Sequence, residues 1–386
     1  MRIFYASDNT PNSDLRSDLW RNNLYLPLID LGHDVVEFDY EWGATFTKLN
    51  TNAPEFKSFI AENRPRVSAE LLSQLKTAHQ KKPIDLFFSY FYDACVLPEA
   101  IDEIRAMGIV TVNWYCNGSY QLQLVSEISP HYDWCLVPEK FRMKDYEAMG
   151  AHPIYCQEAA NDHIYKPYDL PVEFDVTFVG QCYGERPGYI KFLQNAQIDV
   201  KVWGLGWRSQ SQAKRPSLFG SKLISVTEWK AAARRVLKAV RPSQAHSSLR
   251  GLSNGSLPPE MLGGPLSDLE LIQMFSRSKI NLGFSTCGNT HESSHRILQV
   301  RLRDFEVPMS GGFYMVEYME ELEEFYEIGK EIVCYRDPDD LVDKIRYYLS
   351  HDAEREQIRQ AGHSRCLLDH TWQKRFTSAF RQMGIE

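Results

Sequence analysis

Short apolar runs alternate with stretches of helical periodicity along the chain. Six apolar runs in the first half predict β-strands at residues 3–6, 34–38, 86–89, 110–114, 134–137 and 152–156. Between them, apolar residues recur at helical spacing over residues 20–31, 54–80 and 98–107. Strands separated by helices are typical of a parallel sheet with crossover helices, so the first half is predicted to be a doubly wound α/β domain.

The alternation restarts after a polar segment at residues 161–169, which we interpret as a linker. Beyond it the pattern predicts strands at residues 176–179, 200–203, 280–284, 312–316 and 331–335. Helices are predicted at residues 186–195, 338–350 and 352–368. Two α/β halves of similar size predict two Rossmann-like domains that face each other across a cleft. Ligands of such sheets bind at the carboxyl ends of the strands.

Residues 208–263 break this pattern and form a basic insert. Between Arg208 and Arg250 the chain holds ten lysines and arginines but a single acid, Glu228. One interpretation is a solvated helix that docks a small apolar face, including Trp229, on the domain. The other is a basic amphipathic segment, within 208–250, that contacts an anionic membrane surface, an anionic acceptor or a partner.

The composition indicates a soluble globular protein with more than one domain. A chain of 386 residues with 43% hydrophobic and 24% charged residues is long for a single core, and its net charge of −8 argues against general nucleic-acid coating. The start of the chain turns polar too soon for a signal peptide, and no apolar run approaches the roughly 18 residues of a membrane span. We therefore expect a cytoplasmic protein, with peripheral contact to the inner membrane face through the insert as a further hypothesis.

The cysteines give no indication of a metal site. Eight of them are spread along the chain without a Cys-x-x-Cys pair and without Cys/His pairing at zinc-ligand spacing. This usage fits reduced thiols in a cytoplasmic protein.

Candidate chemistry is concentrated in residues 299–334. Arg301, Arg303 and Glu306 stand a few residues before the pair Gly311-Gly312. Arginine side chains suit a diphosphate, a carboxylate suits ribose hydroxyls, and glycine lets the backbone approach phosphate closely. The segment therefore favours a nucleotide-sugar site, although an exposed helix with a glycine cap would have the same residues.

Several motifs of the second half resemble one enzyme family. They are Asp175-Val-Thr-Phe-Val-Gly180, Phe275 through Ser285, Arg303-Asp-Phe-Glu-Val-Pro308, Gly329-Lys-Glu-Ile-Val333 and Lys344-Ile-Arg-Tyr-Tyr-Leu349. Together with the closing segment around His370-Thr371-Trp372 they cover most of residues 170–380, and they resemble the CgeB-like, group 1 family of glycosyltransferases with the GT-B fold. The resemblance of residues 1–168 is looser.

This resemblance implies a division of labour between two Rossmann-like domains. Residues 1–168 would bind the acceptor, and residues 169–365, with the basic insert, would bind the nucleotide-sugar donor. Residues 366–386 would form a helix that crosses back onto the N-terminal domain. The implied activity is glycosyl transfer without a metal ion and with retention at the anomeric carbon.

Donor-binding candidates follow from what this chemistry needs. Without a metal, cationic side chains and helix N-termini must stabilise the leaving nucleoside diphosphate. The turn after strand 176–179 is predicted to lie near the phosphates. Arg301 and Arg303 are two apart, so on a helix they cannot face the same way, and at most one should reach the diphosphate. The full predicted donor set is Gly180, Tyr183, Gly184, Arg186, Lys279, Ser285, Arg301, Arg303, Glu306, Gly311, Gly312 and Phe313.

Glu306 matches the glutamate that hydrogen-bonds ribose hydroxyls in related retaining transferases. Relatives often carry a second glutamate eight residues earlier, where this chain has Leu298. The paired-carboxylate pattern is therefore absent. His291, Glu292 and His295 could contact the donor sugar instead, or could belong to a polar loop.

The acceptor side is predicted around Asn117, after the strand at 110–114, where many relatives place a histidine or an aspartate. An amide can orient a hydroxyl but cannot act as a general base. This fits a front-face mechanism in which the leaving phosphate accepts the acceptor's proton. Asp8, after the first strand, and His131 are alternative acceptor-side groups, although the sequence favours a structural role for both.

The sequence thus predicts a nucleotide-sugar glycosyltransferase that needs no cofactor besides its donor. A UDP-sugar is favoured, with GDP- and dTDP-sugars as alternatives. The acceptor stays open between a glycan, a lipid-linked molecule, a protein, a small molecule and nucleic acid. The alternative functions are a non-hydrolysing sugar-nucleotide epimerase and a binding or scaffold protein that lost catalysis.

Overall fold

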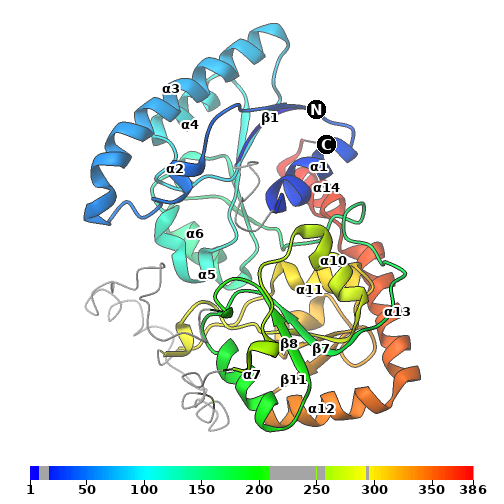
Figure 1. Ribbon diagram of the computed structural model, residues 1–386. Coiled ribbons are helices and arrows are strands. Elements are labelled where there is room, and N and C mark those ends of the chain that lie inside the picture. The colour runs from blue at the N-terminus through cyan, green and yellow to red at the C-terminus, as the bar shows by residue number, and fades with distance from the viewer. Residues whose placement is uncertain (8–16, 209–248, 250–256, 293–294, 386) are drawn as a thin grey trace.

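The computed structural model describes residues 1–7, 17–208, 249, 257–292 and 295–385. Two parallel β-sheets, each flanked by helices, lie one above the other in Figure 1. The first sheet has the strand order β2-β1-β3-β4-β5-β6, and the second has the order β11-β10-β9-β7-β8. Both sheets are parallel throughout, so each has one edge at which all of its strands end.

The strands of the first sheet are β1 (Arg2–Ala6), β2 (Asp34–Glu37), β3 (Leu86–Ser89), β4 (Val110–Trp114), β5 (Trp134–Val137) and β6 (Pro153–Tyr155). Those of the second sheet are β7 (Phe174–Val179), β8 (Val200–Trp203), β9 (Ser278–Gly283), β10 (Tyr314–Glu317) and β11 (Val333–Tyr335). All of these strands were predicted, with small shifts at their ends. The apolar runs were reliable signals because central parallel strands are buried on both faces, as all four residues of β3 are.

The helices of the N-terminal half are η1 (Arg21–Tyr25), α1 (Leu26–Asp30), α2 (Gly43–Phe46), η2 (Pro54–Phe56), α3 (Lys57–Lys81), α4 (Pro98–Ala106), α5 (Gly118–Gln121), η3 (Leu122–Leu124), η4 (Ser129–His131), η5 (Lys140–Arg142) and α6 (Met143–Ala148). Those of the C-terminal half are α7 (Arg186–Asn195), η9 (Pro259–Met261), α10 (Asp268–Ser276), η10 (Thr290–Glu292), α11 (Leu302–Met309), η11 (Glu320–Glu324), α12 (Pro338–Ser350), α13 (Asp352–Asp369) and α14 (Trp372–Met383).

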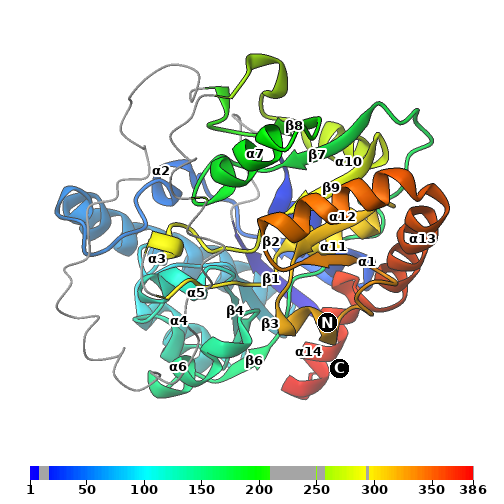
Figure 2. The ribbon, with the colours of Figure 1, turned by 90° about the horizontal axis from the view of Figure 1, so that it is seen from below.

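The helices cover both faces of the second sheet. Met315 of β10 packs in the core on the side of α7 and α12, which are visible in Figure 2. Its neighbours Tyr314 and Val316 point to the other side and pack with α10 and α11. This alternation is the period of a β-strand, and it makes the second half a three-layer α/β domain.

Helix α10 was not predicted, although its start carries a recognisable signal. The side chain of Ser267 accepts a hydrogen bond from the amide of Glu270, and the Glu270 carboxylate accepts one from the amide of Ser267 at 2.8 Å. This reciprocal pair is a capping box. The helix follows the basic insert, most of which lies outside the described residues, and the change of pattern there obscured its start.

Helix α14 crosses back to the N-terminal domain, as predicted, and lies beside α1 in Figure 1. The indole nitrogen of Trp372 donates a hydrogen bond to Asn23 Oδ1 at 2.9 Å, and its ring lies 5.5 Å from that of Trp114. The Phe376 ring packs 5.6 Å from that of Phe88. The crossing helix therefore closes the core of the domain in which the chain began.

A substitution at the start of α14 can test how much this helix contributes to stability. Thr371 is the N-cap residue, and its hydroxyl oxygen accepts a hydrogen bond from the Lys374 amide at 3.3 Å. We expect Thr371→Ala to lower the free energy of unfolding by about 1 kcal/mol, measured by chemical denaturation. Thr377→Ala on the same helix is the matched control and should change it by less than about 0.5 kcal/mol, because Thr377 is exposed. Equal losses in both variants would contradict the capping role.

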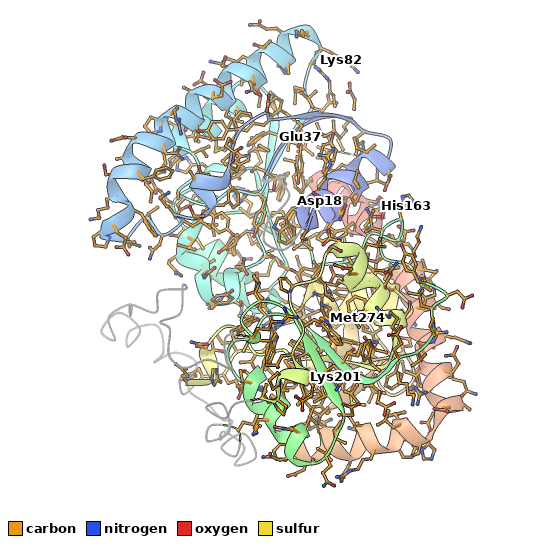
Figure 3. All side chains as sticks on the ribbon, viewed as in Figure 1. Asp18, Glu37, Lys82, His163, Lys201 and Met274 are labelled. Carbon is orange, nitrogen blue, oxygen red and sulfur yellow. The ribbon has the colours of Figure 1, made fainter. Side chains whose placement is uncertain are left out.

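The two domains also contact each other directly. The amide of Asp18, labelled in Figure 3, donates to Asp268 Oδ2 of α10 at 2.8 Å. On the other side of the junction, the Tyr155 hydroxyl donates to Glu321 Oε1 at 2.7 Å. Direct bonds of this kind bring the ends of the strands of the two sheets toward each other.

Two negative findings bear on function. Among the helices in the described part of the chain, none combines the length and apolar character that crossing a membrane requires. The same residues hold no group of three or more histidine, cysteine or acidic side chains that could bind a metal ion. All eight cysteines carry free thiols.

Candidate functional site

The candidate site lies where the carboxyl ends of strands from both sheets meet. The hydroxyl of Ser119, in α5 after β4, donates a hydrogen bond to Gln299 Oε1, and the thiol of Cys287 lies 3.0 Å from the same oxygen. Beside them, a Cβ built on Gly288 would lie 3.7 Å from the ring of Tyr120. Segments that follow β4 in one sheet and β9 in the other are thus in contact.

The turn between β7 and α7 lies at these strand ends, and hydrogen bonds fix its backbone. The indole nitrogen of Trp207 donates to the Gly180 carbonyl at 2.7 Å, and the Gly180 amide donates to the Trp203 carbonyl at 2.8 Å. Gly184 has φ +60°, and a Cβ there would lie 2.6 Å from the Gly288 carbonyl oxygen. Only glycine fits such a position. The predicted turn therefore brings the N-terminus of α7 to the strand ends, next to the loop after β9.

Arg186 begins α7 and is 9% exposed. Its guanidinium stacks on the Tyr183 ring at 3.9 Å, and Nη1 donates to the Gln181 carbonyl at 2.9 Å. Its Nε is buried without a hydrogen-bond partner, and no carboxylate of the described residues forms an ion pair with it. Burial lowers the pKa of Arg186 to about 10. The group is a buried cation whose charge is not compensated by these residues.

Arg301 precedes α11 and is partly exposed; burial lowers its pKa, but the groups around it, including the Asp304 carboxylate that accepts from its amide at 2.8 Å, raise the pKa above its ordinary value. Its Nη2 donates to the carbonyls of Thr286 at 2.6 Å and Ser285 at 3.4 Å, while Nε is buried without a partner. It, too, forms no ion pair with a described carboxylate. The charge of Arg301 contributes to the lowered pKa of Arg186, after burial, so the two guanidiniums lie within electrostatic range of each other. Two neighbouring guanidiniums, neither of which forms a side-chain ion pair with a described carboxylate, favour binding of an anion between them.

Arg303 faces another way, in keeping with its spacing from Arg301. Its Nη1 bonds Glu306 Oε2 at 2.5 Å, and the Tyr165 hydroxyl also hydrogen-bonds the Glu306 carboxylate. Glu306 is 2% exposed, and burial raises its pKa. Arg303 therefore forms an ion pair inside the protein, whereas Arg301 forms none with a described carboxylate.

A fourth arginine, Arg296, is fully paired. Its Nη1 and Nη2 bond the two oxygens of Glu317 at 2.6 and 2.8 Å, and Nε bonds Glu185 at 2.6 Å. The Thr286 hydroxyl donates to Glu185 at 2.6 Å. Through this network the loop that contains Arg296, between β9 and α11, is bonded to the start of α7 and to the end of β10. No local sequence pattern predicts this network, because its members come from three separate segments.

Several predicted donor residues lie at the opposite edge of the second sheet. Lys279 stands at the start of β9 and pairs with Asp175 at 2.7 Å. Gly311, Gly312 and Phe313 come before β10, and a Cβ on Gly311, whose φ is +69°, would lie 2.8 Å from Pro167. The beginnings and ends of parallel strands lie at opposite edges, so these four residues are not brought together with Arg186 and Arg301. Their role in donor binding stays a prediction.

The residues predicted for the acceptor side do not all lie at the meeting strand ends. Asn117 lies after β4 at the meeting strand ends, where its Oδ1 is 3.5 Å from the Tyr120 hydroxyl. His131 precedes β5 and pairs with Asp102 of α4 at 2.9 Å, at the opposite edge of the first sheet. Asp8 lies outside the described residues. Of the three, the structure brings Asn117 to the site.

Two glutamates at the site were missed by sequence reasoning. Glu139 follows β5 and Glu158 follows β6, and they are 3% and 6% exposed. Glu139 Oε1 accepts from the Ser119 amide at 3.3 Å, and burial raises the pKa of Glu139 to about 7. Burial likewise raises the pKa of Glu158 well above its ordinary value. The sequence signal that could have identified them is an acidic residue two or three positions after an apolar strand.

Comparison with known proteins identifies the fold. Residues 186–381 match the family described as glycosyl transferase-like, while no curated protein matches the chain in sequence. Sucrose-phosphate synthase from Thermosynechococcus elongatus is similar in structure with a TM-score of 0.59 at 12% identity, over 99% of this chain and 98% of that one. HepE from Anabaena, solved in complex with UDP-glucose, has a TM-score of 0.53 at 11% identity over 99% of both chains. A putative UDP-N-acetylglucosamine 2-epimerase from Listeria monocytogenes has a TM-score of 0.51 at 10% identity over 100% of this chain and 95% of that one. The predicted GT-B fold is thereby confirmed.

Proposed function

The chain belongs to the glycosyl transferase-like family, and we propose that it transfers a sugar from a nucleotide-diphosphate sugar to an acceptor. The observation that carries this proposal is the pair Arg186 and Arg301. Arg186 is buried and Arg301 is partly buried at the ends of strands of the second sheet, and neither forms a side-chain ion pair with a described carboxylate. A diphosphate carries the two negative charges that would compensate them.

The local backbone supports the same assignment. Arg186 is the first residue of α7, and Arg301 is the N-cap residue of α11, so the amide ends of both helices lie beside the two cations. Helix N-termini attract phosphate through their free amide groups and their dipoles. A donor placed there would have its leaving group held without a metal ion, which is the metal-independent chemistry we propose.

The donor's nucleotide is proposed from the structural neighbours. HepE was solved with UDP, with UDP and glucose, and with UDP-glucose. We take a UDP-sugar as the first choice, with GDP- and dTDP-sugars as alternatives. The ribose role of Glu306 stays a prediction, and in this arrangement Arg303 and Tyr165 would hold its carboxylate in place.

For the chemical step we propose retention by a front-face mechanism. The bond between the anomeric carbon and the bridging phosphate oxygen breaks, and its electron pair stays on the phosphate. The acceptor oxygen bonds the anomeric carbon from the same face, and its proton passes to the leaving phosphate. Asn117 would orient the acceptor hydroxyl through its amide. Residues 1–168 would form the acceptor domain and residues 169–365 the donor domain.

A nucleotide panel tests this proposal. We expect UDP at about 100 times its dissociation constant to stabilise the fold by about 2.7 kcal/mol, which would raise Tm by about 3 °C. UMP and uridine are the matched controls. They should give smaller shifts, because they lack the diphosphate that the two arginines would bind. Equal shifts with UMP and UDP, or no shift with any nucleotide diphosphate, would reject the proposed donor site.

An epimerase is the second candidate, because the structure from Listeria monocytogenes has the same fold and is described as a putative epimerase. The two reactions differ in their need for an acceptor. Incubation with UDP-N-acetylglucosamine alone would give the epimer if the chain were an epimerase. A transferase would leave the sugar configuration unchanged and release UDP only slowly, by hydrolysis.

A further inference from the structure

Tyr120 is an exposed aromatic residue at the place where the strand ends of the two sheets meet. It belongs to α5, which lies on the side of the N-terminal domain that faces the C-terminal domain in Figure 1. Tyr120 is 38% exposed. Its hydroxyl is 3.5 Å from Asn117 Oδ1, which is long for an O–H···O hydrogen bond, and no shorter hydrogen bond joins it to a described residue. Both the ring and the hydroxyl can therefore contact a ligand.

The ring of Tyr120 packs against the loop that follows β9. Its Cδ2 atom would lie 3.7 Å from a Cβ on Gly288, and the Gly288 carbonyl oxygen would lie 2.6 Å from a Cβ on Gly184, in the turn before α7. In the same loop, the Thr286 carbonyl accepts a hydrogen bond from Arg301 Nη2 at 2.6 Å. Desolvation raises the pKa of Tyr120 to about 12 and the charge of Arg301 opposes this rise, in keeping with these contacts. One short loop thus connects Tyr120 with both places where the diphosphate is proposed to bind.

Hydrogen bonds fix the backbone on both sides of Tyr120. Arg142 Nη2 donates to the Ser119 carbonyl at 2.6 Å, and the Tyr115 hydroxyl donates to the Gln121 carbonyl at 3.0 Å. A side chain on a fixed backbone loses less conformational entropy when a ligand binds. A contact made by Tyr120 can therefore contribute measurably to affinity.

The sugar is the part of the proposed donor that would meet Tyr120. It is bonded directly to the diphosphate, so a diphosphate at Arg186 and Arg301 brings the sugar to the same strand ends. A sugar ring has C–H groups on its faces and hydroxyls at its edge. The negative face of an aromatic ring attracts the C–H groups, and a phenol hydroxyl can donate to or accept from a sugar hydroxyl. One tyrosine offers both kinds of contact.

We propose that Tyr120 binds the transferred sugar of the donor, with its ring against a C–H face of the sugar and its hydroxyl bonded to a sugar hydroxyl. This inference rests on the proposed function. It assigns part of the recognition of the donor to the N-terminal domain, while the diphosphate is bound by the C-terminal domain. Tyr120 should therefore affect affinity for the sugar and not affinity for the nucleotide.

Calorimetry with UDP and with UDP-glucose tests this contact without any acceptor. Tyr120→Ala should bind UDP as the natural protein does, but should bind UDP-glucose about tenfold more weakly, because it loses both the ring contact and the hydrogen bond. Tyr120→Phe keeps the ring and should bind UDP-glucose about threefold more weakly. UDP-N-acetylglucosamine should rank the three proteins in the same order.

Tyr347→Ala is the matched control. Tyr347 is 44% exposed, and its ring stacks on His351 at 3.8 Å. It stands near the end of α12, a helix that begins after β11 at the strand ends and runs away from them. This variant should bind UDP and UDP-glucose as the natural protein does. The Tm of each ligand-free variant shows that the fold is kept.

The outcomes separate this inference from the proposed function. If UDP does not bind the natural protein, the proposed function fails and the inference falls with it. If Tyr120→Ala weakens the binding of UDP and UDP-glucose by the same factor, Tyr120 acts through the contact between the domains and only the inference is overturned. Unchanged affinity for both ligands also overturns it, including the case in which Tyr120 contacts the acceptor and its loss lowers the rate of transfer alone.

Discussion

Replacing Arg301 with glutamine is expected to abolish most donor-dependent activity while the ligand-free protein stays folded. The guanidinium has a buried Nε, donates to the carbonyls of Ser285 and Thr286, and forms no side-chain ion pair with a described carboxylate. If it holds the leaving diphosphate, its loss should lower kcat/KM about 100- to 1000-fold, as loss of a charge-stabilising donor does elsewhere. UDP release from a UDP-sugar, with or without an acceptor, is the measurement.

The stability of the same variant makes the prediction sharper. Arg301 donates hydrogen bonds to two carbonyls, and its surroundings raise its pKa although burial lowers it, so the Tm of the ligand-free variant should fall only slightly. The Tm increase that UDP causes should largely disappear. Arg277→Gln is the matched control, because Arg277 pairs with Glu173 at the opposite edge of the sheet. A variant of Arg301 that loses stability but still responds to UDP would show that Arg301 is a structural residue.

The fold could be predicted from the sequence because its signals are local. A buried parallel strand such as Leu86–Ser89 appears as an apolar run, and a glycine-bearing turn followed by an arginine marks the start of α7. The crossing of α14 was implied by family resemblance rather than by pattern. Nothing in the periodicity of residues 372–383 shows which domain their apolar face contacts.

The site was predicted less well because closeness in sequence was taken for closeness in space. Arg301 and Gly311 are ten residues apart, and α11 lies between them. Eight helical residues at about 1.5 Å each span about 12 Å, so one end of α11 reaches the site and the other end lies toward the opposite edge. The same reasoning explains why Lys279 lies away from Ser285. Lys279 is near the start of β9, and Ser285 follows the other end of that strand.

The residues that sequence analysis missed are far apart in the sequence but close in space. Glu158 and Arg301 are 143 positions apart in the sequence, and they act on each other because the two sheets present their strand ends to one another. Arg296, Glu185 and Glu317 likewise come from different segments. A single sequence has no pattern that pairs such residues, since each looks like an ordinary surface charge until the topology is known.

The Arg296 network leads to the prediction with the largest effect on stability. Glu185 and Glu317 are 7% and 2% exposed, and Arg296 bonds both carboxylates. Arg296→Gln would leave two buried carboxylates without their counter-charge, and we expect a loss of about 3–5 kcal/mol in the free energy of unfolding at neutral pH. Denaturant unfolding measures it. Arg277→Gln again serves as the control and should cost less than about 1 kcal/mol, because that ion pair is solvent-exposed.

A double-mutant cycle can show that the loss comes from the unpaired carboxylates and not from a lost side chain. If it does, Glu185→Gln together with Arg296→Gln should be destabilised less than the two single changes added together, because one uncompensated charge is removed. Additive losses would mean that Arg296 stabilises the loop by packing alone.

Arg296 and Arg301 are expected to serve different roles. Both arginines lie near the same strand ends, but Arg296 forms ion pairs with two described carboxylates and Arg301 forms none. Stability should therefore depend on the first, and donor binding on the second.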